Sequence, residues 1–396
     1  MEEQNKSREH IFQGGMYLLQ PEKSIFLYGL SLTDPVEPEL LQKALDRTLS
    51  KMDYFRLSLC GDEKDPYHVQ NDRPCLVYPE GEKRKIPEET NGYLFYVTYK
   101  DCSVYLHCWH FLTDGRGAFF FASQLIKEYC VLRYHIDYAD TPFPKETPLT
   151  WEEMEPYYQP YVKGDGLLDA EIFQQESRGI MMRVDKSSVI ALAKEKGAKP
   201  FCCLLALLSL AAQRSLGKEE FAIEYTVNAR PAVGHPEALY NCSAMFTDIV
   251  SPGRGQTFDQ MIGHIAEGVK RNLLPETVRD KLSQLLGFIR EIYKLSAPLS
   301  VKKRVYQMAQ GEVPAFTLSF CGSLPLGDAP GIERYLTDFY ILLPVRETPM
   351  LVAVTDLGGQ WNFGIEHRYP NDDLPEILRS VMEEHNIKVN EIRAIE

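Results

Sequence analysis

One hexapeptide of the chain, His110-Phe-Leu-Thr-Asp114-Gly115, combines residue types that can do acid–base chemistry. An imidazole takes up and releases a proton near neutral pH, because its reference pKa is about 6.5. A general base must be held in place, and Asp114 could fix the ring or the loop, or pair with an arginine from elsewhere in the chain. Because a buried carboxylate without a partner costs several kcal/mol, we expect Asp114 to have a partner.

The elements that must position this hexapeptide are a strand before it and a helix after it. Alternation over residues 103–110 places the apolar side chains of a strand on the same face as His110. Gly115 and Gly117 permit backbone angles that other residues avoid, so we predict a turn there and a helix over 117–133. The sequence therefore predicts an imidazole at the end of a strand, on a rigid scaffold.

Strands and helices alternate along the remaining chain, which indicates a mixed α+β protein. We predict helices over residues 37–52, 187–196, 201–216, 258–273, 276–295 and 374–385. We predict strands over residues 24–32, 54–59, 93–99, 180–184, 221–227, 243–250, 315–320, 339–343, 350–356 and 361–369. A proline-rich stretch over 138–165 indicates a crossover between two subdomains, residues 1–160 and 161–396.

Composition excludes several classes of partner. The 396 residues carry a formal net charge of −13, so we expect neither a nucleic acid nor an anionic membrane surface as partner. The longest apolar run, 201–212, is shorter than the about 20 residues that a membrane-spanning helix needs. Nine cysteines without a CxxC pair are typical of reduced, buried thiols, and together with the polar N-terminus they predict a cytoplasmic protein.

A metal site is the alternative use of the histidines and cysteines around the hexapeptide. His107, Cys108 and His110 are the nearest candidates. Alternation places His107 on the opposite face of the strand, and no other pair of residues has zinc-like spacing. We therefore expect no metal.

The hexapeptide resembles the HxxxDG motif of the superfamily that contains chloramphenicol acetyltransferase, alcohol O-acetyltransferases, plant BAHD acyltransferases and peptide-synthetase condensation domains. Val227-Asn228-Ala229-Arg230-Pro231 is similar to the N-x-R-P segment in the second half of such proteins, and residues 240–250 resemble the strand that follows it. The resemblance covers nearly the whole chain. It implies an α+β fold of two chloramphenicol acetyltransferase-like subdomains, each a mixed sheet flanked by helices, with a channel between them.

The resemblance also implies an acyltransferase and a role for each motif residue. His110 would be the general base for an acceptor hydroxyl or amine, Asp114 a structural partner of Arg230, and Gly115 the close neighbour of the channel. The acyl donor would be a thioester on coenzyme A or on the phosphopantetheine arm of an acyl carrier protein, with no tightly bound cofactor. The implied substrate-binding residues are Trp109, Asn228, Thr317 and Ser319, the last two as candidate donors to the oxyanion.

Two differences from members of the superfamily indicate which branch the chain resembles most. Trp109 precedes His110 where condensation domains usually carry a second histidine, and the DFGWG segment of BAHD enzymes is absent. The chain is therefore most similar to free-standing bacterial acetyltransferase-like proteins. Two alternatives remain: a non-catalytic protein of the same fold that binds a thioester or a carrier protein, and a condensation-type enzyme that forms amides.

Overall fold

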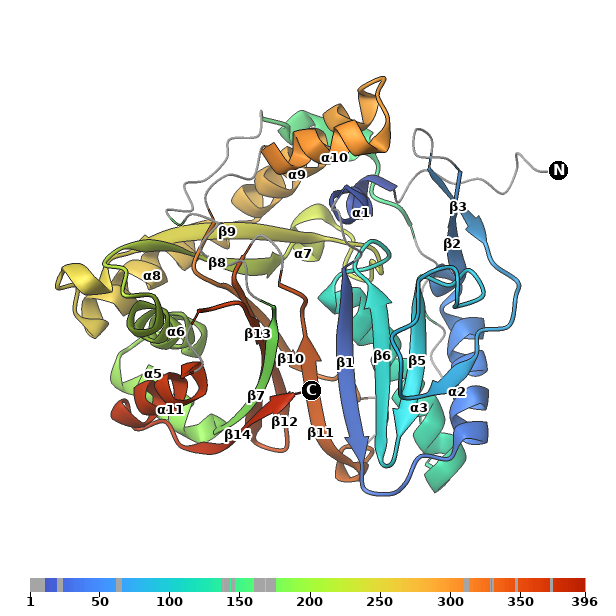
Figure 1. The fold of residues 1–396 in the computed structure, drawn as a ribbon, viewed down its shortest axis with the longest axis horizontal. Helices are drawn as coiled ribbons and strands as arrows, with labels where there is room; N and C mark the ends of the chain where they lie inside the picture. The colour runs from blue at the N-terminus through green and yellow to red at the C-terminus, as the bar shows by residue number, and fades with distance from the viewer. Residues whose placement is uncertain are drawn as a thin grey trace.

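The computed structural model contains two β-sheets with helices on their outer faces (Figure 1). The described residues are 11–19, 24–61, 66–136, 138, 143, 147–159, 168, 176–308, 313–327, 329, 331–345, 348–370 and 373–395. One sheet has five strands, the other has seven, and a two-stranded ribbon lies apart from both. Among the described residues, no helix combines the length and the apolar character needed to cross a membrane.

The first half of the chain supplies four strands of the five-stranded sheet, whose order is β11-β1-β6-β5-β4. The helices α2 and α3 pack against each other beside this sheet (Figure 1). Asp114 caps α3, because its side chain accepts a hydrogen bond from the backbone N–H of Gly117 at 2.9 Å. The elements of this half are α1 (Ile11–Leu18), β1 (Ile25–Leu32), α2 (Pro38–Lys51), η2 (Asp53–Arg56), β2 (Leu57–Cys60), β3 (Tyr67–Gln70), β4 (Val77–Pro79), β5 (Phe95–Lys100), β6 (Ser103–Trp109), α3 (Gly115–Tyr134), α4 (Trp151–Met154) and η3 (Glu155–Tyr157).

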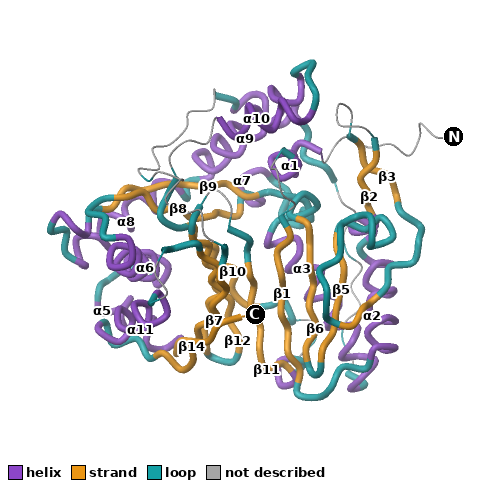
Figure 2. The backbone as a smooth tube through the Cα atoms, in the orientation of Figure 1, coloured by secondary structure: helices purple, strands orange, loops and turns teal. Residues whose placement is uncertain are grey.

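The second half builds the seven-stranded sheet, whose order is β14-β7-β13-β12-β10-β8-β9. The nearly apolar helix α6 is buried and packs against α5, α8 and α11, which lie with it beside this sheet (Figure 2). The elements are β7 (Arg178–Asp185), α5 (Lys186–Glu195), α6 (Pro200–Leu216), β8 (Phe221–Asn228), α7 (Arg230–Val233), β9 (Ser243–Val250), η5 (Pro252–Arg254), α8 (Phe258–Asn272), α9 (Pro275–Lys294), α10 (Leu299–Met308), β10 (Thr317–Ser323), η6 (Glu333–Tyr335), β11 (Leu336–Leu342), β12 (Met350–Leu357), β13 (Gln360–His367), α11 (Leu374–Glu384) and β14 (Val389–Ile395).

Strand β11 joins the two sheets, because it comes from the second half of the chain but pairs with β1 in the first sheet. Its other side lies against β13, where Gly364 makes the close approach possible: a Cβ at this position would come within 1.9 Å of the carbonyl oxygen of Ile341. The backbone oxygen of Phe339 also accepts hydrogen bonds from Thr355 and Asn362, at 2.6 and 2.8 Å. The sheets therefore do not follow the two halves of the sequence. The predicted boundary between residues 160 and 161 lies outside the described residues and remains a prediction.

Most predicted elements are present within a few residues, and the exceptions have simple causes. The strand predicted over 54–59 is wrong in its first half, where η2 buries Tyr54 and Phe55, because a short apolar run does not distinguish strand from helical turn. Helix α1 was not predicted, since its two glycines disfavour a helix. The edge strand β14 was not predicted either, because charged and polar residues interrupt its apolar pattern. The mixed α+β class is confirmed.

Candidate active site

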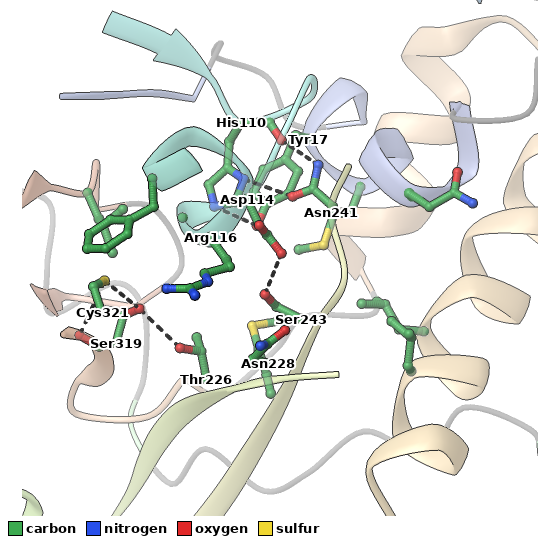
Figure 3. Close-up of a pocket in the computed structure, with 18 of the residues that line it drawn as sticks. Tyr17, His110, Asp114, Arg116, Thr226, Asn228, Asn241, Ser243, Ser319 and Cys321 are labelled. Carbon is green, nitrogen blue, oxygen red and sulfur yellow. Dashed lines mark hydrogen bonds between the residues drawn. The ribbon is translucent and has the colours of Figure 1, made fainter. Parts of the chain in front are cut away.

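A cavity of about 230 Å³ lies where the two sheets and the helices α1 and α9 meet. Its wall is polar near the HxxxDG motif and apolar along α9 (Figure 3). Six separate regions of the chain contribute to it: α1, the β6–α3 junction, β8 with β9, α9, β10, and the end of β11. The lining residues include Gln13, Tyr17, His110, Asp114, Gly115, Arg116, Thr226, Asn228, Asn241, Ser243, Leu286, Ile289, Ser319 and Cys321.

His110 follows the last residue of β6 directly, and its ring is half-buried at the cavity wall. Its Nδ1 lies 3.0 Å from the side-chain oxygen of Asn241. The amide nitrogen of Asn241 donates to the backbone oxygen of His110 at 2.9 Å, which fixes the orientation of the amide. Because the oxygen of Asn241 can only accept, the neutral ring carries its proton on Nδ1. The nitrogen Nε2 is therefore the basic one.

Tyr17 of α1 covers that basic nitrogen. Its hydroxyl lies 3.0 Å from Nε2 of His110, and its ring stacks on the imidazole with centroids 3.8 Å apart (Figure 3). Neither Tyr17 nor Asn241 was singled out from the sequence. Asn241 lies in the segment that resembles the family strand, so the resemblance could have indicated it as a site residue. Nothing in the sequence indicated Tyr17, because α1 was not predicted.

Asp114 and Arg230 form the buried ion pair that the resemblance implied. Two hydrogen bonds of 2.8 and 2.9 Å join the guanidinium to the carboxylate, and both residues are 1% exposed. The backbone N–H of Cys242 and the hydroxyl of Ser243 also donate to Asp114, each at 2.9 Å. Burial by itself raises the pKa of Asp114, but Arg230 and the backbone donors outweigh burial and lower it to about 2. The carboxylate is therefore ionised and structural.

Arg230 is held by further acceptors, so the pair connects several loops. Its guanidinium donates to the backbone oxygens of Ala238 and Tyr240, at 2.7 and 2.8 Å. Asn228 accepts from both the backbone and the side chain of Arg230 at 3.2 Å, and it also lines the cavity. The pair therefore fixes the β8–β9 connection against the motif loop.

Gly115 of the motif and Gly117 after it act differently from the prediction. Gly115 and Gly117 are the first and third residues of α3, and neither has a positive φ. A Cβ on Gly117 would lie 2.1 Å from the backbone oxygen of Leu239 and the hydroxyl of Thr113, so close packing excludes a side chain there. Gly115 lines the cavity, and its backbone oxygen accepts a hydrogen bond from Tyr28. The expectation that these positions need unusual backbone angles is wrong.

The four predicted substrate-binding residues divide into two pairs. Asn228 and Ser319 line the cavity, and the hydroxyl of Ser319 lies 3.2 Å from that of Thr226. Trp109 does not line it: this residue is buried beside Phe111, because alternation turns it away from the face of His110.

Thr317 does not line the cavity either. It shares a face of β10 with Ser319 but is the first residue of that strand, two positions before Ser319. Its hydroxyl donates to Glu224 at 2.7 Å, and the hydroxyl of Thr348 lies 3.2 Å from it. Thr317 is therefore a buried strand residue whose hydroxyl already has partners.

The arrangement suits proton transfer and binding of an organic substrate. No group of histidine, cysteine and acidic side chains in the described part of the chain has the geometry to hold a metal ion. His107 lies away from the cavity, 3.0 Å from Thr98 and 3.5 Å from Glu80. The cavity therefore combines one oriented base, one closed ion pair and an apolar wall.

Comparison with known proteins finds likeness at the level of structure. No family model and no curated protein sequence matches the chain. Polyketide synthase associated protein 5 from Mycobacterium tuberculosis is 14% identical, with a TM-score of 0.65 over 96% of this chain and 97% of that one. The starter condensation domain of rhizomide synthetase RzmA, in complex with C8-CoA, is 13% identical, with a TM-score of 0.65 over 97% and 95%.

A further similar structure is F. graminearum TRI101 complexed with coenzyme A and T-2 mycotoxin. It is 12% identical, with a TM-score of 0.64 over 97% of this chain and 99% of that one. At these identities the likeness shows the fold alone. It confirms the two-part fold that the HxxxDG resemblance implied.

Proposed function

Because the chain has the fold of the chloramphenicol acetyltransferase-like superfamily, we propose that it is an acyltransferase in which His110 is the general base. The observation that carries the proposal is the orientation of one ring. Asn241 fixes the proton on Nδ1 of His110, which leaves Nε2 basic at the wall of a cavity large enough for a small organic group. A base needs this combination of access and orientation.

The reaction is a direct transfer between two bound substrates. Nε2 takes the proton of an acceptor O–H or N–H while the acceptor atom attacks the carbonyl carbon of a thioester. The new C–O or C–N bond forms, the C–S bond breaks, and the thiolate leaves with the proton returned from the imidazolium. Ser319 is the proposed donor to the oxyanion of the tetrahedral intermediate, because its hydroxyl lines the same cavity as His110.

An acyl-enzyme is not part of the proposal, because the nucleophilic side chains of the cavity are poorly suited to it. The hydroxyl of Ser243 donates to Asp114. Burial raises the pKa of the Cys321 thiol to about 11, so the thiol stays protonated near neutral pH.

The donor and the acceptor follow from different observations. Two similar structures hold coenzyme A or C8-CoA, which supports an acyl-CoA donor for this chain. The condensation domains among the similar structures keep an acyl carrier protein as an alternative source of the thioester. The hydroxyl of Tyr17 lies 3.0 Å from Nε2, so a hydroxyl group fits the position that the acceptor must take.

The same contact favours a second candidate function, a non-catalytic protein that binds a thioester. In that case Tyr17 would keep Nε2 permanently occupied. The two functions differ in the fate of the thioester, because only the enzyme releases a free thiol.

The test is a thiol-release assay with a panel of acyl-CoAs and small alcohols and amines, on the wild type and His110→Ala. Loss of a general base lowers kcat/KM by about 100- to 10,000-fold, while the thermal unfolding midpoint stays close to that of the wild type. The matched control is His107→Ala, which removes an imidazole from the same strand outside the cavity. Equal turnover in His110→Ala would contradict the proposal. Binding without thiol release in the wild type would favour the second function.

A further inference from the structure

Arg116 is a charged cavity residue that the proposed mechanism does not use. It is the second residue of α3, and its side chain is among those that line the cavity (Figure 3). Its guanidinium carbon lies 4.7 Å from the ring centroid of Phe120 and 5.7 Å from that of Phe119. Within the described part of the chain, no hydrogen bond or ion pair satisfies this guanidinium. Its five N–H donors are therefore available to a ligand.

The charges around the cavity leave that cation uncompensated. Asp114 is the acidic side chain among the lining residues, and Arg230 already neutralises it through two hydrogen bonds. The whole chain carries a formal net charge of −13, so the unpaired positive charge of Arg116 is opposite in sign to the charge of the protein as a whole. The N-terminus of α3 adds a further positive partial charge beside Arg116. The cavity thus attracts anions although the protein repels them.

The guanidinium of Arg116 lies in the same cavity as His110, the proposed general base. Burial raises the pKa of the Cys321 thiol, and the positive charge of Arg116 acts against this rise. A charge has this effect only when it lies near the thiol. Cys321, Arg116 and His110 all line the one cavity of about 230 Å³. A group bound by Arg116 therefore belongs to the part of a substrate that enters this cavity. The phosphates of coenzyme A are separated from the thioester by the long pantetheine arm, so they are not the group that we assign to Arg116.

We propose that Arg116 binds a carboxylate of a substrate, so that the transferred acyl group or the acceptor is an acid with a second functional group. A guanidinium fits a carboxylate with two parallel hydrogen bonds, and the aromatic faces of Phe119 and Phe120 hold its plane. This inference rests on the proposed acyl transfer and specifies its substrate class. The carboxylate has two sources, the acyl chain or the acceptor, and the experiment distinguishes them.

The first arm compares succinyl-CoA with butyryl-CoA, which have equal carbon numbers and differ by a terminal carboxylate. The second compares 3-hydroxybutyrate with 2-butanol as acceptors for one fixed donor. We expect the wild type to prefer the carboxylate-bearing member of one pair by about 10- to 150-fold in kcat/KM, the range for a hydrogen bond to a charged group. Arg116→Gln should remove that preference, and Arg116→Lys should restore part of it. Arg334→Gln, at an exposed arginine of η6, is the matched control and should keep it.

Binding without turnover provides the second readout. Succinate should raise the thermal unfolding midpoint of the wild type and of Arg334→Gln more than that of Arg116→Gln, and butyramide should separate none of them. A wild type without preference in either pair would overturn the inference while leaving acyl transfer intact. An equal fall of kcat with every substrate in Arg116→Gln would also overturn it, because that pattern belongs to stabilisation of the oxyanion. Absence of thiol release in the wild type would refute the proposed function, and the succinate shift would still test Arg116.

Discussion

Arg230 and Arg116 belong to the same neighbourhood of the fold, but they differ in what surrounds their charge. Arg230 is 1% exposed, forms two hydrogen bonds with Asp114, and donates to two backbone oxygens. Arg116 is half-buried at the cavity wall and has the rings of Phe119 and Phe120 as its neighbours. One guanidinium is fully used by the protein, whereas the other has no hydrogen-bonding partner among the described residues.

This difference distinguishes an arginine that stabilises the fold from one that is available to bind a ligand. A buried ion pair with every donor satisfied fixes loops in place, and it has nothing left to offer a substrate. A cation at a cavity wall contributes little to stability and is ready for a charged ligand. His110 belongs to the second group, because its ring lines the cavity and the partner of its basic nitrogen there is the hydroxyl of Tyr17, which an acceptor can displace. The predictions below test whether stability and activity divide along this line.

The largest expected effect is on stability when Arg230 is removed. Arg230→Ala leaves the carboxylate of Asp114 buried without its cation, so the free energy of unfolding should fall by about 3–5 kcal/mol. Arg116→Ala should change it by less than about 0.5 kcal/mol, since no described ion pair is lost. Urea denaturation followed by tryptophan fluorescence measures both. Similar losses in the two variants would break the comparison.

The next effect is a dependence of stability on acid. The pKa of Asp114 is about 2 in the folded protein, below its ordinary value of 3.8, because Arg230 and the backbone donors outweigh burial. As the pH falls, the unfolded chain takes up the proton first. The stabilisation is therefore complete above about pH 5 and is lost as the pH falls through 2, in total about 2 kcal/mol, with about half lost by pH 3.

The measurement is the free energy of unfolding of the wild type and Asp114→Asn from pH 5 to pH 2. The advantage of the wild type should shrink by the amount stated. Asp46→Asn, on the exposed face of α2, is the control for loss of a carboxylate. A constant gap between the wild type and Asp114→Asn would show that the pair does not tune this carboxylate.

The smallest expected effect concerns Tyr17, which lines the cavity like Arg116 and His110. Tyr17→Phe keeps the ring that stacks on His110 but removes the hydroxyl that an acceptor must displace from Nε2. The KM for the acceptor should fall by about 2- to 10-fold, as expected for one neutral hydrogen bond, with kcat within about twofold. Steady-state kinetics with varied acceptor measures this. A large loss of kcat would instead make Tyr17 a proton relay between the acceptor and His110.

Local pattern was enough to predict the strand, the motif and the helix around His110. Alternation in residues 103–110 and helical periodicity after Gly117 depend on neighbours a few positions apart, and β6 and α3 follow them closely. The resemblance added Arg230 as the partner of Asp114, which the hydrogen bonds confirm. Where the local pattern was weak, as in α1 and β14, the prediction failed.

The cavity wall was less predictable, because it is assembled from distant segments. Thr317 and Ser319 share one face of a strand, yet only Ser319 lines the cavity, since the position along β10 relative to β8 decides which hydroxyl lies there. The direction of Trp109 followed from alternation, but its resemblance-based role did not take that direction into account. Contacts with Tyr17 and Asn241 join residues more than 90 positions apart.

The sequence by itself determined the chemistry that is present: an imidazole at a strand end, a carboxylate at a helix start and an α+β pattern around them. These follow from side-chain type and from spacing within single elements. Only the tertiary structure decided which ring nitrogen is basic, which arginine is used up and which remains free. Those properties depend on contacts between α1, the motif and the segment that leads into β9. These segments are far apart in the sequence, so local patterns do not predict which of their residues meet.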